Sequence, residues 1–166
     1  LAICQRRASP QKGKLAGRKH GVHLSEKGHA QAEKLAELMK QAKLQAIYAS
    51  PLERTMETAE PVAKATGLDV IPNDGLLEID YGTWQGKSLK SLRRRKLWPA
   101  IQKTPSLARF PEGESFAEAQ ARIVAEMDSL QRRHHQKKAV IACVFHSDPI
   151  KLAIAHYMGL PLDLFQ

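Results

Sequence analysis

The sequence predicts an α/β fold: a three-layer sandwich in which a mainly parallel sheet carries helices on both faces. Short apolar segments alternate along the chain with longer segments whose apolar residues recur at helical spacing. One segment, residues 139–145, is continuously apolar, as expected of a strand buried on both faces. We find no linker, internal repeat or low-complexity tract, so we expect a single domain over residues 1–166.

The first half of the chain predicts two helices around a short strand. Ser25 is a favourable N-cap for a helix that ends near Lys43. The apolar residues 46–49 then predict a strand buried in the sheet. A second helix is expected over residues 52–66, because Gly67 follows it and glycine readily ends a helix.

The middle of the chain is less regular. Residues 70–71 predict a brief strand, and the following residues 72–75 combine Pro, Asn, Asp and Gly in a turn. Residues 88–101 predict an irregular helix that Pro99 interrupts, since proline lacks the amide that a helix interior requires.

The last third predicts a long helix followed by the buried strand. Glu114 and Ser115 open a helix that runs to about His135, and the strand 139–145 comes next. His146 stands where this strand gives way to another amphipathic helix. Ligands bind at the carboxyl ends of strands in open α/β sheets, and the amides that start a helix favour anions. His146 is therefore a candidate site residue, with a turn or capping role as the alternative.

The charge of the chain suggests anionic partners. The net charge is +9, and residues 81–111 contain eight Lys or Arg and no acid. The basic run within residues 87–96 predicts either the rim of a site for a phosphorylated ligand or a surface for nucleic-acid phosphates. A solvated helix face is the third interpretation. The low aromatic content, 5%, and the lack of a nucleic-acid motif argue against nucleic acid as a partner.

The cysteines and the hydropathy indicate the compartment. Cys4 and Cys143 fit neither a zinc spacing nor a disulfide framework, which is typical of a reducing environment. No apolar run is long enough to span a membrane, so we expect no membrane association and a cytoplasmic protein. Because the chain begins with Leu1 instead of methionine, we expect a fragment of a longer reading frame.

Five sequence blocks occur in an order typical of one family. They are Gly13–Arg18 with Gly21–Gly28, Tyr48–Thr55 with Glu57–Ala59, Leu77–Gly82 with Trp84 and Gly86, Phe110–Ser115, and Val144–His146. Together they resemble the histidine phosphatase superfamily, in its phosphoglycerate mutase-like branch. The resemblance implies a phosphoglycerate mutase-like sandwich and transfer of a phosphoryl group from a monoester to a histidine and then to water or another hydroxyl. It implies no metal and no other cofactor, and a small phosphorylated metabolite as partner.

The resemblance also implies roles for three residues. Arg54 matches the arginine that clamps the phosphate, and His146 matches the second histidine, which supports it. Glu78 matches the carboxyl group that protonates the leaving oxygen. The alternative for Arg54 is a surface salt bridge to Glu53 or Glu57, and for Glu78 a loop carboxylate that offsets the basic surroundings.

The N-terminus departs from the family pattern. The family has Arg-His-Gly or Arg-His-Ala after its first strand, and that histidine is the nucleophile. Aligned without a gap, Cys4 stands at the nucleophile position; with a short deletion, Arg7 does, and Arg6 then takes the place of a phosphate-binding arginine. An arginine offers no lone pair for attack, and His20 lies in a different block.

Two functional hypotheses follow. In the first, the chain is a phosphomonoester hydrolase or phosphotransferase that is impaired because its nucleophilic histidine is missing. In the second, it is a non-catalytic protein that binds phosphorylated metabolites in the retained pocket. Residues 160–166 match a family segment that continues into further strand and helix, so we expect the domain to be incomplete at both ends.

Overall fold

The computed structural model describes residues 2–4, 13–136 and 138–166. Its described strands form one parallel sheet with the spatial order β1-β4-β2-β3. The strands are β1 (Ala2–Cys4), β2 (Ala46–Ala49), β3 (Val70–Pro72) and β4 (Ile141–Phe145). A parallel sheet requires helical crossovers, and these supply the outer layers.

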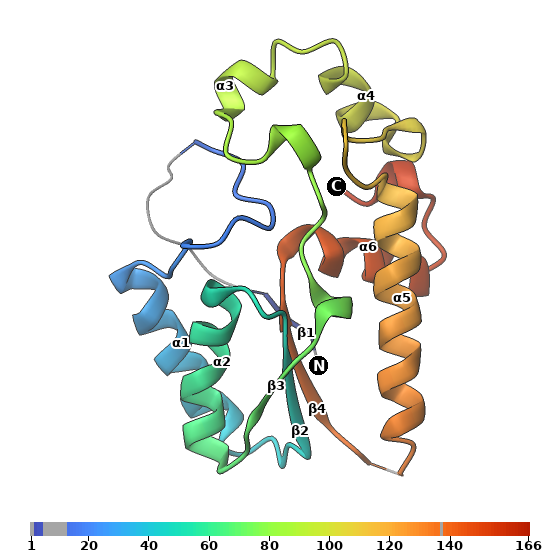
Figure 1. Cartoon of the computed structure of the whole chain (residues 1–166). Helices are drawn as coiled ribbons and strands as arrows, with labels where there is room; N and C mark the ends of the chain where they lie inside the picture. The colour runs from blue at the N-terminus through green and yellow to red at the C-terminus, as the bar shows by residue number, and fades with distance from the viewer. Residues whose placement is uncertain (1, 5–12, 137) are drawn as a thin grey trace.

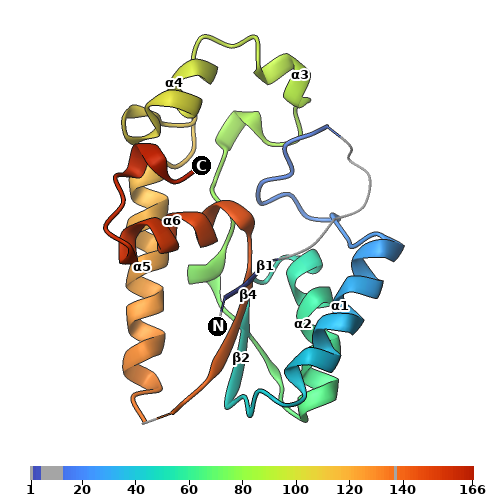
Figure 2. The ribbon, with the colours of Figure 1, turned by 180° about the vertical axis from the view of Figure 1, so that it is seen from behind.

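Helices cover both faces of the sheet, as Figures 1 and 2 show. The helices α1 (Glu26–Met39) and α2 (Glu53–Thr66) pack on one face, and α5 (Phe116–Arg133) and α6 (Ser147–Tyr157) on the other. Two short helices, α3 (Leu89–Leu92) and α4 (Trp98–Lys103), lie beyond the carboxyl ends of the strands. The predicted three-layer α/β fold is confirmed.

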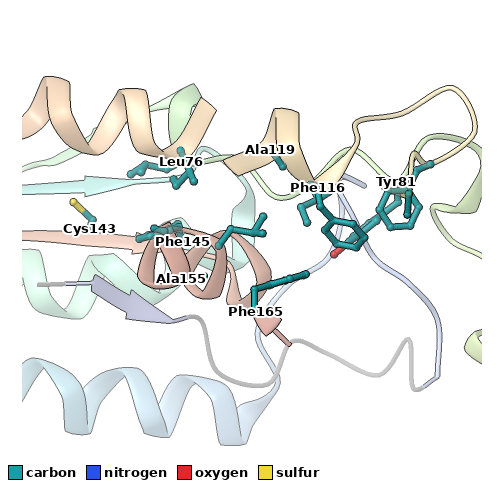
Figure 3. Close-up of a cluster of buried hydrophobic side chains, with 14 of the residues drawn as sticks. Leu76, Tyr81, Phe116, Ala119, Cys143, Phe145, Ala155 and Phe165 are labelled. Atoms are coloured by element: carbon teal, nitrogen blue, oxygen red, sulfur yellow. The ribbon is translucent and has the colours of Figure 1, made fainter. Parts of the chain in front are cut away.

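The alternation of side chains along the strands explains the two-sided core. Ile47 and Val144 belong to the cluster packed against α1 and α2. Tyr48 and Phe145, their neighbours in sequence, belong to the larger cluster on the other face. Figure 3 shows this larger cluster, which extends from Cys143 in the sheet to Phe165 near the end of the chain.

The helix ends follow their local sequences. The hydroxyl of Ser25 accepts a hydrogen bond from the amide of Gly28 at the start of α1, which ends at Met39 and not near Lys43. Gly67 ends α2 with a φ of 72°, a conformation that glycine adopts without strain. At the start of α5, Ser115 and Glu118 form a reciprocal capping box.

The helix expected over residues 88–101 is wrong in its details. The structure has two separate helices, α3 and α4, joined by a turn at residues 93–97. Pro99 does not interrupt a helix but lies in the first turn of α4. Proline is tolerated there because amides of the first turn have no carbonyl partner within the helix.

Candidate functional site

His146 lies at the junction between β4 and α6. Its backbone is extended, with φ −102° and ψ 157°, and it occupies the N-cap position of α6 without capping the helix through its side chain. Only 1% of the residue is exposed. The capping alternative is therefore wrong for the side chain, which is buried at the carboxyl edge of the sheet.

Two hydrogen bonds define the protonation state of His146. Its Nδ1 lies 3.3 Å from Nη2 of Arg54, and its Nε2 lies 2.8 Å from the hydroxyl oxygen of Ser50. A guanidinium can only donate, so Nδ1 accepts and the ring proton resides on Nε2, which donates to Ser50. Burial, reinforced by the positive charges of Arg54 and other arginines, holds the pKa of His146 well below its ordinary value. The imidazole is thus neutral at pH 7.

Ser50 belongs to the same buried cluster as His146, although no motif in the sequence singled it out. It is fully buried directly after β2, just as His146 follows β4. Because β2 and β4 are neighbouring parallel strands, their ends meet at one edge of the sheet. The sequence signal that could have identified Ser50 is a polar residue directly after an apolar strand, the same position that His146 has after β4.

Arg54 stands in the first turn of α2 and faces the protein interior. It is 2% exposed, and its Nη2 donates to the carbonyl oxygen of Gly17 at 2.7 Å. The surface salt bridge considered from the sequence is wrong. The neighbouring Glu53 instead accepts hydrogen bonds from Gly21 and His20.

Glu78 completes the group formed by Arg54 and His146. Its Oε2 lies 3.9 Å from Nδ1 of His146, and its Oε1 accepts a hydrogen bond from the amide of Ile79 at 3.0 Å. Burial, together with the negative charge of Asp148, raises the pKa of Glu78 to about 8, although the Ile79 amide and Arg54 oppose this shift. The carboxyl group is therefore mainly protonated at pH 7.

The loop that carries Glu78 is held from two directions. Arg122 of α5 donates to the carbonyl oxygens of Gly75 and Leu77 at 2.9 and 3.0 Å. Arg18 donates to the carbonyl oxygen of Glu78 at 2.8 Å, and both arginines bind the carboxylate of Glu114. Sequence reasoning did not identify these roles of Arg18, Arg122 and Glu114, because they depend on contacts between distant segments.

Of the nucleophile candidates, Cys4 and His20 lie among the described residues. Arg6 and Arg7 lie outside the described residues. Cys4 is the last residue of β1 and pairs with Phe145, one residue before His146. His20 lies in an exposed loop, with Nδ1 3.3 Å from Oε1 of Glu53.

The basic run of residues 87–96 lies beside a second basic loop, which contains Lys14 and Lys19. The backbone of residues 13–15 pairs with that of residues 86–89, including an antiparallel bridge between Lys14 and Ser88. The two segments thus form a continuous rim next to α3 (Figure 1). Its cations are the exposed Lys14, Lys19, Lys87, Lys90, Arg93, Arg94, Arg95 and Lys96.

The described residues contain neither a metal-binding cluster nor a membrane-spanning helix. No group of three or more His, Cys, Asp or Glu side chains in residues 2–4, 13–136 and 138–166 has an arrangement suited to a metal ion. Within the same part of the chain, no helix combines the length and apolar character needed to cross a bilayer.

The raised pKa of Glu78 predicts a pH-dependent stability. An unfolded glutamate titrates near 4.5 and the folded group near 8, so folding takes up a proton between these values and stability falls as the pH rises through them. Relative to Glu78→Gln, the wild-type free energy of unfolding is expected to fall by about 2–4 kcal/mol from pH 5 to pH 8.5. Urea unfolding of both proteins measures this difference. Because His146 titrates in both proteins, its contribution does not enter the comparison. A difference that stays constant with pH would contradict the assignment.

Comparisons with known proteins show which proteins this chain is similar to. A model of the histidine phosphatase superfamily (branch 1) matches residues 7–166. Over 147 residues the chain is 32% identical to phosphoserine phosphatase 1 of Hydrogenobacter thermophilus, which covers 86% of this chain and 67% of that protein. Over 142 residues it is 32% identical to the probable phosphoglycerate mutase GpmB of Proteus mirabilis, with coverage of 83% and 64%. The chain thus spans about two thirds of the length of both relatives.

The solved structure of YhfR from Bacillus stearothermophilus has a similar fold. It aligns with a TM-score of 0.91 over 99% of this chain and 81% of its own, at 26% identity. The similarity covers the whole arrangement of sheet and helices described above.

Proposed function

This chain belongs to the histidine phosphatase superfamily (branch 1), and from that premise we propose that Arg54, Glu78 and His146 form a site for phosphomonoesters of small metabolites. The proposal depends on one observation: a buried guanidinium lies 3.3 Å from a buried imidazole. Charged and polar nitrogen groups held this close in the interior favour an anion with several oxygens. The reaction class that we propose is phosphomonoester hydrolysis or phosphoryl transfer without a metal or other cofactor.

Arg54 and His146 have complementary parts in holding the anion. The planar guanidinium of Arg54 can donate to two phosphoryl oxygens and stays charged at every relevant pH. His146 is neutral without an anion, and a phosphoryl oxygen near Nδ1 favours protonation of that nitrogen. The imidazolium then donates to the oxygen, so anion binding is coupled to uptake of a proton.

Glu78 is suited to the role of general acid. A phosphomonoester leaves as an alkoxide unless a group protonates its bridging oxygen. A carboxyl group whose pKa is about 8 still holds its proton at pH 7 and can supply it. After the transfer, the resulting carboxylate can accept a proton from the next nucleophile, such as water.

The covalent step is where we expect this chain to be impaired. The family nucleophile is a histidine, and neither Cys4 nor Arg7, the residues that the two alignments place there, is one. Cys143 is buried in the sheet, and burial raises its pKa to about 11, so it is a poor source of thiolate. We therefore propose that the chain binds phosphate groups and turns over monoesters very slowly. A purely non-catalytic phosphometabolite-binding protein is the second candidate.

The cationic rim and the names of the relatives both favour a ligand with more negative charge than one phosphate. The two relatives carry the names of a phosphoserine phosphatase and a phosphoglycerate mutase, whose named ligands combine a phosphate with a carboxylate. The exposed cations of residues 87–96 lie beyond the carboxyl ends of the strands, where they can attract such a ligand. We propose a small phosphorylated metabolite with additional negative charge, and not nucleic acid.

The rim gives this proposal a direct test. Replacing Arg93, Arg94 and Arg95 together by glutamine is expected to raise the Kd for 3-phosphoglycerate roughly three- to tenfold at low salt, measured by calorimetry. The control variant Lys34→Gln/Lys64→Gln/Arg132→Gln loses the same charge from exposed positions on α1, α2 and α5 and is expected to bind as the wild type does. Tight, steeply salt-dependent binding of duplex DNA that the small ester fails to compete would replace the proposal with a nucleic-acid function.

A further inference from the structure

Two carboxylates of α2 hold the loop of residues 17–24. Glu53 and Glu57 are four residues apart, so they project from the same face of the helix. Oε1 of Glu53 accepts from the amide of Gly21 at 3.0 Å, and Oε2 of Glu57 accepts from the amide of Leu24 at 2.7 Å. The loop is thus fixed to α2 at two points of its backbone.

Each carboxylate also binds a histidine of the loop. Nδ1 of His20 lies 3.3 Å from Oε1 of Glu53, and Nδ1 of His23 lies 2.5 Å from Oε1 of Glu57. His29 of α1 faces the same carboxylate, with Nε2 4.0 Å from Oε2 of Glu57. Among the described residues, the groups facing His23 are therefore Glu57 and Glu53 from α2, with His29 from α1 on the far side of Glu57.

The other end of this loop contacts the phosphate site. The carbonyl oxygen of Gly17 accepts the hydrogen bond of Arg54, and Arg18 donates to the carbonyl oxygen of Glu78. Arg18 also pairs with Glu114 at 3.0 Å. Residues 17 and 18 consequently link the phosphate-clamping arginine to the segment that carries the acid.

We propose that Glu53 and Glu57 are positioning residues, which hold the loop of residues 17–24 so that Gly17 and Arg18 set Arg54 and Glu78, and that protonation of His23 strengthens this hold. The inference rests on the proposed phosphate site. It assigns to an exposed His–Glu pair a regulatory effect on a buried anion site, which the pair does not itself contact.

The direction of the pH effect follows from the charges. Hydrogen bonding to Glu57, and the charge of Glu57, raise the pKa of His23 above its ordinary value. Protonated His23 attracts the carboxylate, and this attraction is lost as the pH rises through the raised pKa. The loop is therefore held most firmly on the acidic side of neutrality, and anion affinity declines as the pH rises.

The test compares anion binding in matched variants. Sulfate is the probe because its charge stays constant between pH 6 and pH 8.5, and its Kd is measured by calorimetry. Glu57→Gln keeps an oxygen for the Leu24 amide but loses the charge, so the Kd is expected to rise roughly two- to fivefold at pH 6 and little at pH 8.5. His23→Gln is expected to give the same profile, and the double variant no further change. Glu60→Gln removes the same charge from an exposed position of α2 and is expected to bind as the wild type does.

A second measurement separates positioning from general stability. Hydrogen exchange of the Leu24 amide is expected to accelerate in Glu57→Gln, while exchange in β2 and β4 stays unchanged. An equal rise of Kd at both pH values with faster exchange throughout the protein would show a structural role only and overturn the inference. The inference is also overturned if Arg54→Ala abolishes sulfate binding while Glu57→Gln leaves the Kd for sulfate unchanged. If the wild type binds no sulfate, phosphate or 3-phosphoglycerate, the proposed function itself fails.

Discussion

Arg54→Ala is expected to raise the Kd for phosphate and sulfate by about a hundredfold or more, because it removes the only buried cation placed against His146 among the described residues. Loss of the guanidinium also leaves the Gly17 carbonyl without its 2.7 Å donor. Arg54→Lys keeps the charge but not the planar fork, so an intermediate affinity is expected. Calorimetric titration measures all three proteins under identical conditions.

The interpretation of this result needs a folding control. Circular dichroism and thermal unfolding of each variant show whether the domain persists, and Arg54→Lys remains informative if Arg54→Ala unfolds. Wild-type affinity in a folded Arg54→Lys variant would mean that the bidentate geometry of Arg54 has no part in binding. Wild-type affinity in Arg54→Ala would place the anion site elsewhere in the protein.

A histidine scan of residues 4–7 is expected to restore turnover in one variant, by about a thousandfold or more, because a covalent nucleophile commonly contributes several orders of magnitude. Cys4→His is the variant expected from the alignment without a gap, and Arg7→His from the alignment with a deletion. Hydrolysis of an aryl phosphate measures the gain. Detection of acid-labile phosphohistidine by phosphorus NMR identifies the covalent intermediate.

The control for the histidine scan is a double variant. The rescued variant combined with His146→Ala is expected to lose most of the gain, because His146 supports the phosphoryl group that the new histidine attacks. Robust activity in the unmodified chain would contradict the account if His146→Ala abolished it and changes at Cys4, Arg7 and His20 left it intact. A nucleophile other than the family histidine would then be at work.

The fold was predictable from local sequence patterns. The wrong prediction of one helix over residues 88–101 also has a local cause. Caps at Ser25 and Ser115 and the stop at Gly67 mark helix ends through nearest-neighbour hydrogen bonds and backbone preference. The prediction around Pro99 is wrong because a proline can equally break a helix or begin one. Which of these occurs depends on the turn at residues 93–97, for which the sequence offers no glycine or other distinct signal.

The clustering of the candidate site residues was predictable only in part, because some of its contacts are local in sequence and others join distant segments. Arg54, Glu78 and His146 each follow a strand or turn within a recognisable motif. Ser50 and Arg18 act through hydrogen bonds to residues 96 and 60 positions away, which no local pattern encodes. The raised pKa of Glu78 arises from burial and from the charge of Asp148 in α6, and both exist only in the folded protein.

The most direct test of the account is a crystal structure of the protein soaked with vanadate, which adopts the geometry of a phosphoryl group in transfer. We expect the anion within hydrogen-bond distance of a guanidinium nitrogen of Arg54 and of Nδ1 of His146, with Glu78 beside it and the contact between Arg54 and His146 opened. An ordered vanadate bound instead among Arg93, Arg94 and Arg95, with the Arg54–His146 contact intact, would contradict it.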